Sequence, residues 1–111
     1  MRYLLMIHSD EAGWDELSET EQASRRERYA AVSRSGAVLR ASELGPTSSA
    51  TTVRIENGDM IVTDGPYAET HEALGGLFLV EADSIEVAIE LAKQLPPASG
   101  IEIRPVYGSE S

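Results

Sequence analysis

The sequence predicts an α+β domain in which two β-α-β units flank a β-hairpin. Residues 2–8 and 77–82 are apolar at consecutive positions, a pattern typical of central strands that are covered on both faces. Two segments with helical spacing begin at capping signals, and an Asn57-Gly58 dipeptide between two β-rich runs predicts a tight hairpin. This order matches the ferredoxin-like split βαβ arrangement, in which the first and third core strands lie in the middle of the sheet.

Local signals bound the first β-α-β unit. Its predicted elements are a strand, a helix and a strand, at residues 2–8, 18–36 and 37–43. Ser18 precedes Glu21 at the capping-box spacing, and Gly36 is a typical helix stop. The helix is weakly amphipathic, with Tyr29 and Val32 as the residues that we expect to face inward.

The middle of the chain predicts a hairpin followed by a long loop. Residues 50–56 and 59–63 are rich in β-forming residues, and Asn57-Gly58 between them tolerates the positive φ angles of a type I′ turn. Residues 64–76 are polar and contain several breakers, so they predict a connector that is long for a compact domain. Such a loop is a candidate functional segment.

The second β-α-β unit repeats the pattern of the first. Its predicted elements are a strand at 77–82, a helix from Asp83 or Ser84 to Leu95 and a strand at 101–106. Helical spacing places one apolar stripe along this helix, at Ile85, Ala88, Ile89, Ala92 and Leu95. Pro96-Pro97 is the predicted stop. Residues 1–107 therefore form one domain, and 108–111 are expected to be a frayed tail.

Length and composition exclude several classes of protein. A chain of 111 residues is long enough for one core. Its net charge of −10 disfavours direct binding of nucleic acid or anionic membranes. The absence of cysteine excludes disulfides, thiolate nucleophiles and Cys-ligated metals. The short apolar run at Tyr3–Ile7 predicts neither a signal peptide nor a membrane span, so we expect a cytoplasmic protein.

The predicted sheet has one face that its own helices do not cover. Two helices cover only one side of a four-stranded sheet, which leaves Leu4, Met6 and part of the run from Phe78 to Val80 on the other side. We expect a homodimer whose sheets pack face to face. A monomer of 12 kDa in light scattering at micromolar concentration would contradict this.

The topology predicts a cluster of titratable residues at one end of the sheet. The first and third core strands are antiparallel neighbours, so His8 at the end of the first lies beside the loop that precedes the other. Asp64 in that loop is a candidate base or orienting partner for a histidine. Asp64-Gly65-Pro66 is also a typical turn sequence, and both interpretations are compatible.

A second histidine belongs to the same loop. His71, with Glu69 and Glu72 nearby, is either a proton shuttle or a solvated loop residue. A metal site formed by His8, His71 and a carboxylate is conceivable by ligand type, but no ligand spacing supports it. Trp14 is either a hydrophobic plug or the wall of a pocket. Motifs of serine hydrolases, P-loop proteins and dinucleotide-binding proteins are absent from the sequence.

Four stretches of sequence resemble the YCII-related family, in particular its DGPF-domain branch. They are TDGPYAETHEALGGLFLVEADS, the opening RYLLMIHSDEAGW, the hairpin TTVRIENG and the closing IEIRPV, which together cover nearly the whole chain. Tyr67 stands where the family usually has Phe, and His71 stands where Lys is common. A role for His71 therefore does not follow from the family pattern.

The resemblance implies a ferredoxin-like subunit that forms a dimeric α+β barrel. It implies small acid/base enzymes in which a His and an Asp line a pocket, with one group acting in dehydrochlorination of a chlorinated aromatic. Asp64 matches the signature Asp, and His8 is the candidate His. Relatives are often encoded beside extracytoplasmic-function sigma factors, which implies a regulatory link.

The leading hypothesis is therefore a cofactor-independent enzyme, lyase- or isomerase-like, that performs elimination, isomerisation or proton transfer on a small organic molecule. Its candidate catalytic residues are His8, Asp64 and His71; its candidate substrate-binding residues are Trp14, Tyr67, Glu69, Gly75 and Gly76. The alternative is a non-catalytic dimeric module that senses a ligand or docks a protein such as a sigma factor.

Overall fold

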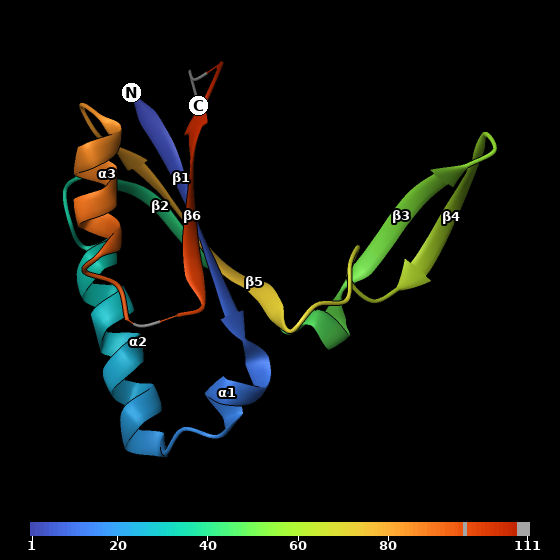
Figure 1. Ribbon diagram of the computed structural model, residues 1–111, viewed down its shortest axis with the longest axis horizontal. Coiled ribbons are helices and arrows are strands. Elements are labelled where there is room, and N and C mark those ends of the chain that lie inside the picture. The colour runs from blue at the N-terminus through green and yellow to red at the C-terminus, as the bar shows by residue number, and fades with distance from the viewer. Residues whose placement is uncertain (97, 109–111) are drawn as a thin grey trace.

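A computed structural model describes residues 1–96 and 98–108. The described chain forms a four-stranded antiparallel sheet, a separate two-stranded sheet and helices packed on the larger sheet (Figure 1). In chain order the elements are β1 (Arg2–Asp10), α1 (Glu11–Asp15), α2 (Glu19–Ser33), β2 (Val38–Glu43), the 3-10 turn η1 (Thr47–Ser49), β3 (Thr51–Glu56), β4 (Asp59–Asp64), β5 (Glu72–Glu81), α3 (Ile85–Ala92) and β6 (Gly100–Val106).

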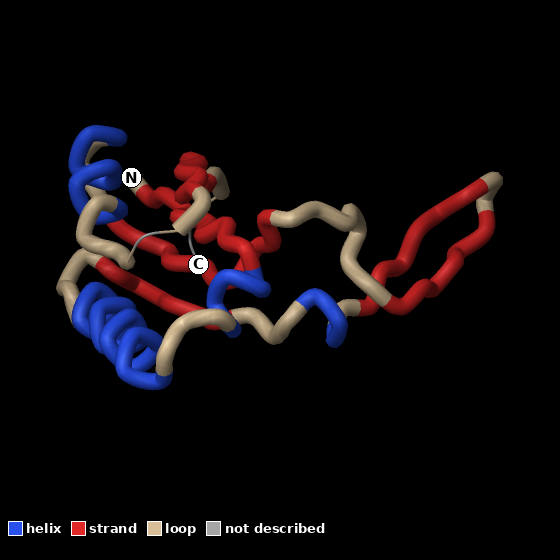
Figure 2. The backbone as a smooth tube through the Cα atoms, turned by 60° about the horizontal axis from the view of Figure 1, so that its bottom comes forward, coloured by secondary structure: helices blue, strands red, loops and turns tan. Residues whose placement is uncertain are grey.

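The strand order of the larger sheet is β2-β5-β1-β6. The two strands that the sequence predicts to be central, β1 and β5, are central, so that prediction is confirmed. Each pair of neighbouring strands is antiparallel. Helices α2 and α3 lie on the same side of this sheet (Figure 2).

The hydrophobic core lies between the sheet and these two helices. Side chains alternate between the two faces of a strand, so Leu5 of β1 and Val80 of β5 point to the helical side, where both are fully buried. Val32 of α2 and Ala88 of α3 cover them from above. Tyr29 packs against this cluster, and its ring stacks on that of Phe78 with centroids 6.4 Å apart.

In the described chain the opposite side of the sheet has no helix on it, and we call it the open face. Strand register and pleat assign to it the alternate residues of each strand. Its residues include Arg2, Leu4, Met6 and His8 of β1, Leu74, Leu77, Leu79 and Glu81 of β5, Arg40 and Ser42 of β2, and Glu102, Arg104 and Val106 of β6. The open face is therefore apolar in the middle of β1 and β5, where Leu4, Met6, Leu77 and Leu79 lie, and mostly polar along the two edge strands.

The predicted hairpin is confirmed, and it stands apart from the rest of the molecule. Strands β3 and β4 pair through Asn57 and Gly58, whose φ angles of 51° and 85° are those of the predicted turn. We call Thr51–Asp64 the arm. Figures 1 and 2 show the arm projecting from the body, joined to it by two connecting segments.

The third core strand begins earlier than the sequence predicts. β5 starts at Glu72 rather than at residue 77, because its first residues pair with the end of β1. A bulge in this pairing absorbs one extra residue of β5. The predicted loop over 64–76 is therefore too long, and the connection between β4 and β5 spans 65–71.

Both long helices end before the predicted stops. α2 ends at Ser33, because the chain turns tightly into β2, and Gly36 does not adopt the left-handed conformation of a glycine cap. α3 ends at Ala92, because the N–H groups of Gln94 and Leu95 donate to carbonyls three residues earlier, as in the tightened last turn of a helix. Leu95 follows the helix and is still buried in the core.

Two sequence predictions fall partly on residues outside the described chain. Pro97, one of the two prolines of the predicted stop, and 109–111, most of the predicted tail, lie there. Among the described helices, none combines the length and the hydropathy that crossing a membrane requires.

Candidate functional site

A cavity of about 630 Å³ lies on the helical side of the sheet. It is bounded by α1, by α2 and by the adjacent parts of β1, β2 and β5. Its lining includes hydroxyls, carboxylates, one guanidinium and aromatic rings, from Ser9, Glu11, Trp14, Asp15, Arg26, Tyr29, Ser33, Glu43, Gly75, Gly76 and Phe78 among others. Three of the predicted substrate-binding residues, Trp14, Gly75 and Gly76, are thus brought together here.

The aromatic wall of the cavity is held by α1 and α2. α1 begins because the Asp10 carboxylate accepts a hydrogen bond from the Ala12 N–H, and this short helix carries Trp14. The guanidinium of Arg26 lies over the Trp14 ring, 5.1 Å from its centroid. Burial raises the pKa of the Tyr29 hydroxyl above its usual value, so Tyr29 presents a neutral hydroxyl at neutral pH.

The two glycines keep the cavity floor free of side chains. A Cβ at Gly76 would lie 3.3 Å from the carbonyl oxygen of Ser42, which is closer than nearly all such contacts. A Cβ at Gly75 would lie at an ordinary 3.5 Å from the Ser9 hydroxyl. A side chain at position 76 would therefore press on the backbone of β2, whereas a side chain at position 75 would narrow the cavity.

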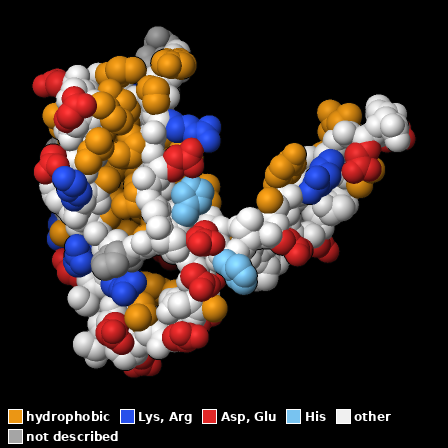
Figure 3. All heavy atoms as spheres, in the orientation of Figure 1, with side chains coloured by type: hydrophobic (Ala, Val, Ile, Leu, Met, Phe, Trp, Pro, Cys, Tyr) orange, Lys and Arg blue, Asp and Glu red, His pale blue; other side chains and the backbone are white. Residues whose placement is uncertain are grey.

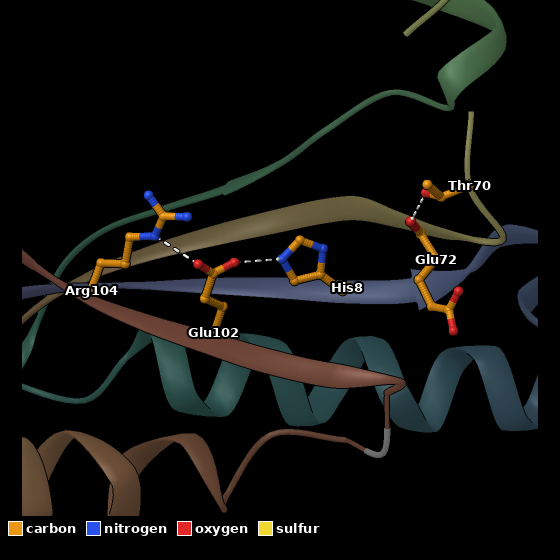
Figure 4. A network of polar contacts seen from close by, with 5 residues as sticks. All are labelled: His8, Thr70, Glu72, Glu102 and Arg104. Carbon is orange, nitrogen blue, oxygen red and sulfur yellow. Dashed lines mark hydrogen bonds and ion pairs between the residues drawn. The ribbon is translucent and has the colours of Figure 1, made fainter. Parts of the chain in front are cut away.

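A second polar cluster lies on the open face (Figure 4). His8 Nε2 lies 3.2 Å from Glu102 Oε1, and Arg104 Nε donates to Glu102 Oε2 at 2.6 Å. The two residues meet because β6 pairs with β1, which places Glu102 diagonally opposite His8 on the same face. Their side chains are partly exposed, at 34% for His8 and 40% for Glu102.

Glu102 is held in its ionised form by this cluster. The hydrogen bonds from Arg104 and then from His8 lower the pKa of the carboxyl below its usual value. Because folding lowers this pKa, the contacts are present at neutral pH and are lost as the pH falls through the lowered value. The sequence analysis missed Glu102; the available signal was the alternation of Glu102 and Arg104 on one face of the last strand.

Asp64 lies away from the ring of His8. It is the last residue of β4, opposite Thr51 at the base of the arm. Within the described chain, no hydrogen bond or ion pair joins Asp64 to His8, whose ring contacts Glu102. The turn that follows is present: Gly65 has a φ of 111° and accepts a hydrogen bond from the Thr52 hydroxyl at 2.7 Å.

The remaining predicted site residues lie in the connection between the arm and β5. Tyr67 is exposed, and its ring lies 4.7 Å from the Arg54 guanidinium, which also donates to the Tyr67 carbonyl at 2.7 Å. Glu69 and His71 are exposed. The Thr70 hydroxyl donates to the Glu72 carbonyl, which closes this connection onto β5 (Figure 4).

The structure thus distributes the predicted residues over three places. Trp14, Gly75 and Gly76 line the cavity, His8 lies on the open face, and Asp64, Tyr67, Glu69 and His71 lie at or after the base of the arm. Ile7 and Ser9 line the cavity, whereas His8 between them faces the opposite side. Among the described residues, no group of three His, Cys, Asp or Glu side chains is arranged to hold a metal ion.

Comparison of the sequence with known proteins identifies one family and one similar protein. A family model described as the YCII-related domain matches residues 1–109. The chain is also similar to an uncharacterized protein of Rhizobium meliloti (strain 1021), R00369, with 32% identity over 117 aligned positions. The match covers 96% of this chain and 92% of that protein.

Proposed function

The chain belongs to the YCII-related domain family, and we propose that it is an acid/base enzyme of the DGPF-domain branch. The proposed reaction is a cofactor-independent proton transfer, elimination or isomerisation on a small organic molecule. The observation that carries this proposal is the chain of contacts from Arg104 through Glu102 to His8. An imidazole paired with an ionised carboxylate is the common arrangement of a general acid/base.

The contacts define the role of each residue. Glu102 can only accept a hydrogen bond, so in the neutral ring it orients the tautomer that carries the proton on Nε2. Nδ1 then has a free lone pair and can accept a proton from a substrate. Arg104 is a positioning residue, because it fixes the second oxygen of the carboxylate and keeps Glu102 ionised.

A homodimer belongs to the same proposal. The apolar side chains along β1 and β5 give the open face the character of an interface, and a second sheet packed on it would complete a dimeric α+β barrel. Such packing would surround His8 and Glu102 with protein and reduce their contact with water. Charge interactions within the cluster strengthen as water is excluded.

The tautomer of His8 tests the catalytic assignment. In nitrogen NMR spectra recorded in alkaline solution, the His8 ring is expected in the Nε2–H form because Glu102 accepts that proton. In the Glu102→Ala variant the ring is expected to return to the tautomer mixture of a solvated histidine, in which the Nδ1–H form is also populated. His71 serves as the internal control, since it is exposed and is expected to show the tautomer mixture of a solvated ring in both proteins. An Nδ1–H ring at His8 in the unaltered protein would refute the proposed base.

The cavity supports a second candidate function, a ligand-binding module. It lies on the side of the sheet opposite His8, and aromatic rings surround it. Its carboxylates, on Glu11, Asp15 and Glu43, outnumber its single guanidinium on Arg26. An aromatic ligand with an ammonium group matches this lining. In this case a link to sigma-factor regulation would depend on the ligand, because the ligand-bound protein would bind a partner protein such as a sigma factor.

Fluorescence of Trp14 tests this second candidate directly. Trp14 is the single tryptophan of the chain and lies on the cavity wall, so its emission reports on the cavity alone. Benzylamine is expected to change this emission at lower concentration than benzoate, because the net charge of the lining is negative. Gly75→Val, which narrows the cavity, is expected to weaken the response. Equal responses to both probes, unchanged in Gly75→Val, would exclude the cavity as a selective site.

A further inference from the structure

The arm carries an apolar face that nothing in the described chain covers. In the register of β3 and β4, Val53 lies opposite Val62 and Ile55 opposite Met60, so the four side chains share one face. Their exposed fractions are 54%, 65%, 74% and 71% in that order. A two-stranded hairpin is marginally stable in water by itself, so a surface that packs against this face would stabilise the arm.

The two faces of the arm have different chemistry. The face opposite the apolar one carries the charged side chains Arg54, Glu56 and Asp59 together with Thr52, Thr63 and one apolar residue, Ile61, which is 37% exposed and therefore less exposed than the four of the apolar face. On the apolar face, charge occurs only at the base, where Asp64 continues the row of Val62. The apolar face is thus more hydrophobic and more exposed than the opposite face, as expected for the face of a ribbon that packs against protein.

The position of the arm is fixed at its base. The Glu11 carboxylate accepts hydrogen bonds from the Thr47 hydroxyl at 2.6 Å and from the Thr47 N–H at 2.9 Å, which ties η1 to α1. These bonds lower the pKa of Glu11, so the tie persists at neutral pH. The Leu44 N–H donates to the Gly75 carbonyl on the same connection. The segment that leads into the arm is therefore anchored to the body.

The held arm leaves an opening beside the open face. Figure 3 shows the space between body and arm, with hydrophobic side chains on the side of the arm that faces the body. The Cα radius of gyration is 15.8 Å, whereas a compact domain of about 100 residues has about 13 Å. The opening is thus bounded by two surfaces with apolar side chains, one on the sheet and one on the arm.

We propose that a second copy of this chain occupies the opening and that the apolar face of the arm clasps it. The inference rests on the homodimer of the proposed function and adds the arm as a necessary part of its interface. A copy whose open face lies on the first open face has its body beside the first arm. In a two-fold dimer the relation is reciprocal, so each arm holds the other body.

Matched charge substitutions on the two faces of the arm test the clasp. Ile55→Asp and Met60→Asp place a carboxylate on the apolar face, whereas Thr63→Asp places the same charge on the opposite face of the same hairpin. In sedimentation equilibrium, Ile55→Asp and Met60→Asp are each expected to raise the dissociation constant of the dimer at least about tenfold. Thr63→Asp is expected to leave that constant within about twofold of the value for the unaltered protein. Because all three positions are exposed in a single chain, the subunits are expected to remain folded.

Cysteine labelling provides a measurement that does not depend on those variants. The chain has no cysteine, so Ile55→Cys and Thr63→Cys each provide one thiol. Iodoacetamide is expected to modify Ile55→Cys more slowly as protein concentration rises, while Thr63→Cys reacts at a constant rate. A dimer that all three aspartate variants leave intact would overturn the clasp but not the homodimer. A protein that stays monomeric would overturn both, while the tautomer of His8 would still decide the catalytic assignment.

Discussion

Replacing His8 with Gln is expected to slow proton exchange catalysed by this protein by about 10²- to 10⁴-fold. Glutamine keeps a similar size and can still donate to Glu102, but it cannot take up a proton. The reaction to measure is the loss of carbon-bound protons from small carbonyl compounds in D₂O, followed by proton NMR. The assay follows the step that base-catalysed elimination and isomerisation share, which is the removal of a carbon-bound proton.

His71→Gln is the matched control for this experiment. It removes the second of the two histidines, which is exposed in the connection between the arm and β5. We expect unchanged exchange in this variant. Equal loss in both variants would implicate the loop rather than the pair on the open face, and unchanged exchange in His8→Gln would refute the proposed base. A protein that accelerates no exchange would favour the ligand-binding candidate.

The part of the fold that follows from local patterns could be predicted. Apolar side chains on both faces identify β1 and β5 as central strands, and Asn57-Gly58 identifies the hairpin, because each signal lies within a few residues of the structure it determines. The helix that begins after Asp10 was missed, although Asp10 caps it, because one cap before a single helical turn is a weak signal.

The candidate site could be predicted only in part, because it depends on pairing between distant strands. His8 and Glu102 are far apart in the chain, and they meet because β6 pairs with β1 at one register. A shift of one residue would move Glu102 to the other face. The same alternation separates His8 from Ile7 and Ser9, so the cavity and the histidine occupy opposite sides of the sheet.

Leu5→Ala is expected to lower the free energy of unfolding by about 2–5 kcal/mol. Leu5 is fully buried between β5 and the helices, and its truncation removes apolar contacts and leaves a cavity in the core. For a domain of this size the loss is a large part of the total stability. Chemical denaturation followed by circular dichroism measures it, and we expect the same loss at low and at high protein concentration.

Leu4→Ala is the neighbouring control, and it separates the core from the proposed interface. The side chain of Leu4 is on the open face, so its truncation costs the single subunit less than the truncation of Leu5. In a dimer that buries the open face, however, this truncation also weakens association, and its cost therefore grows with protein concentration. A loss for Leu4→Ala that is independent of concentration would show that the open face is not covered by a second copy. A small loss of unfolding free energy for Leu5→Ala would contradict the position of Leu5 in the centre of the core.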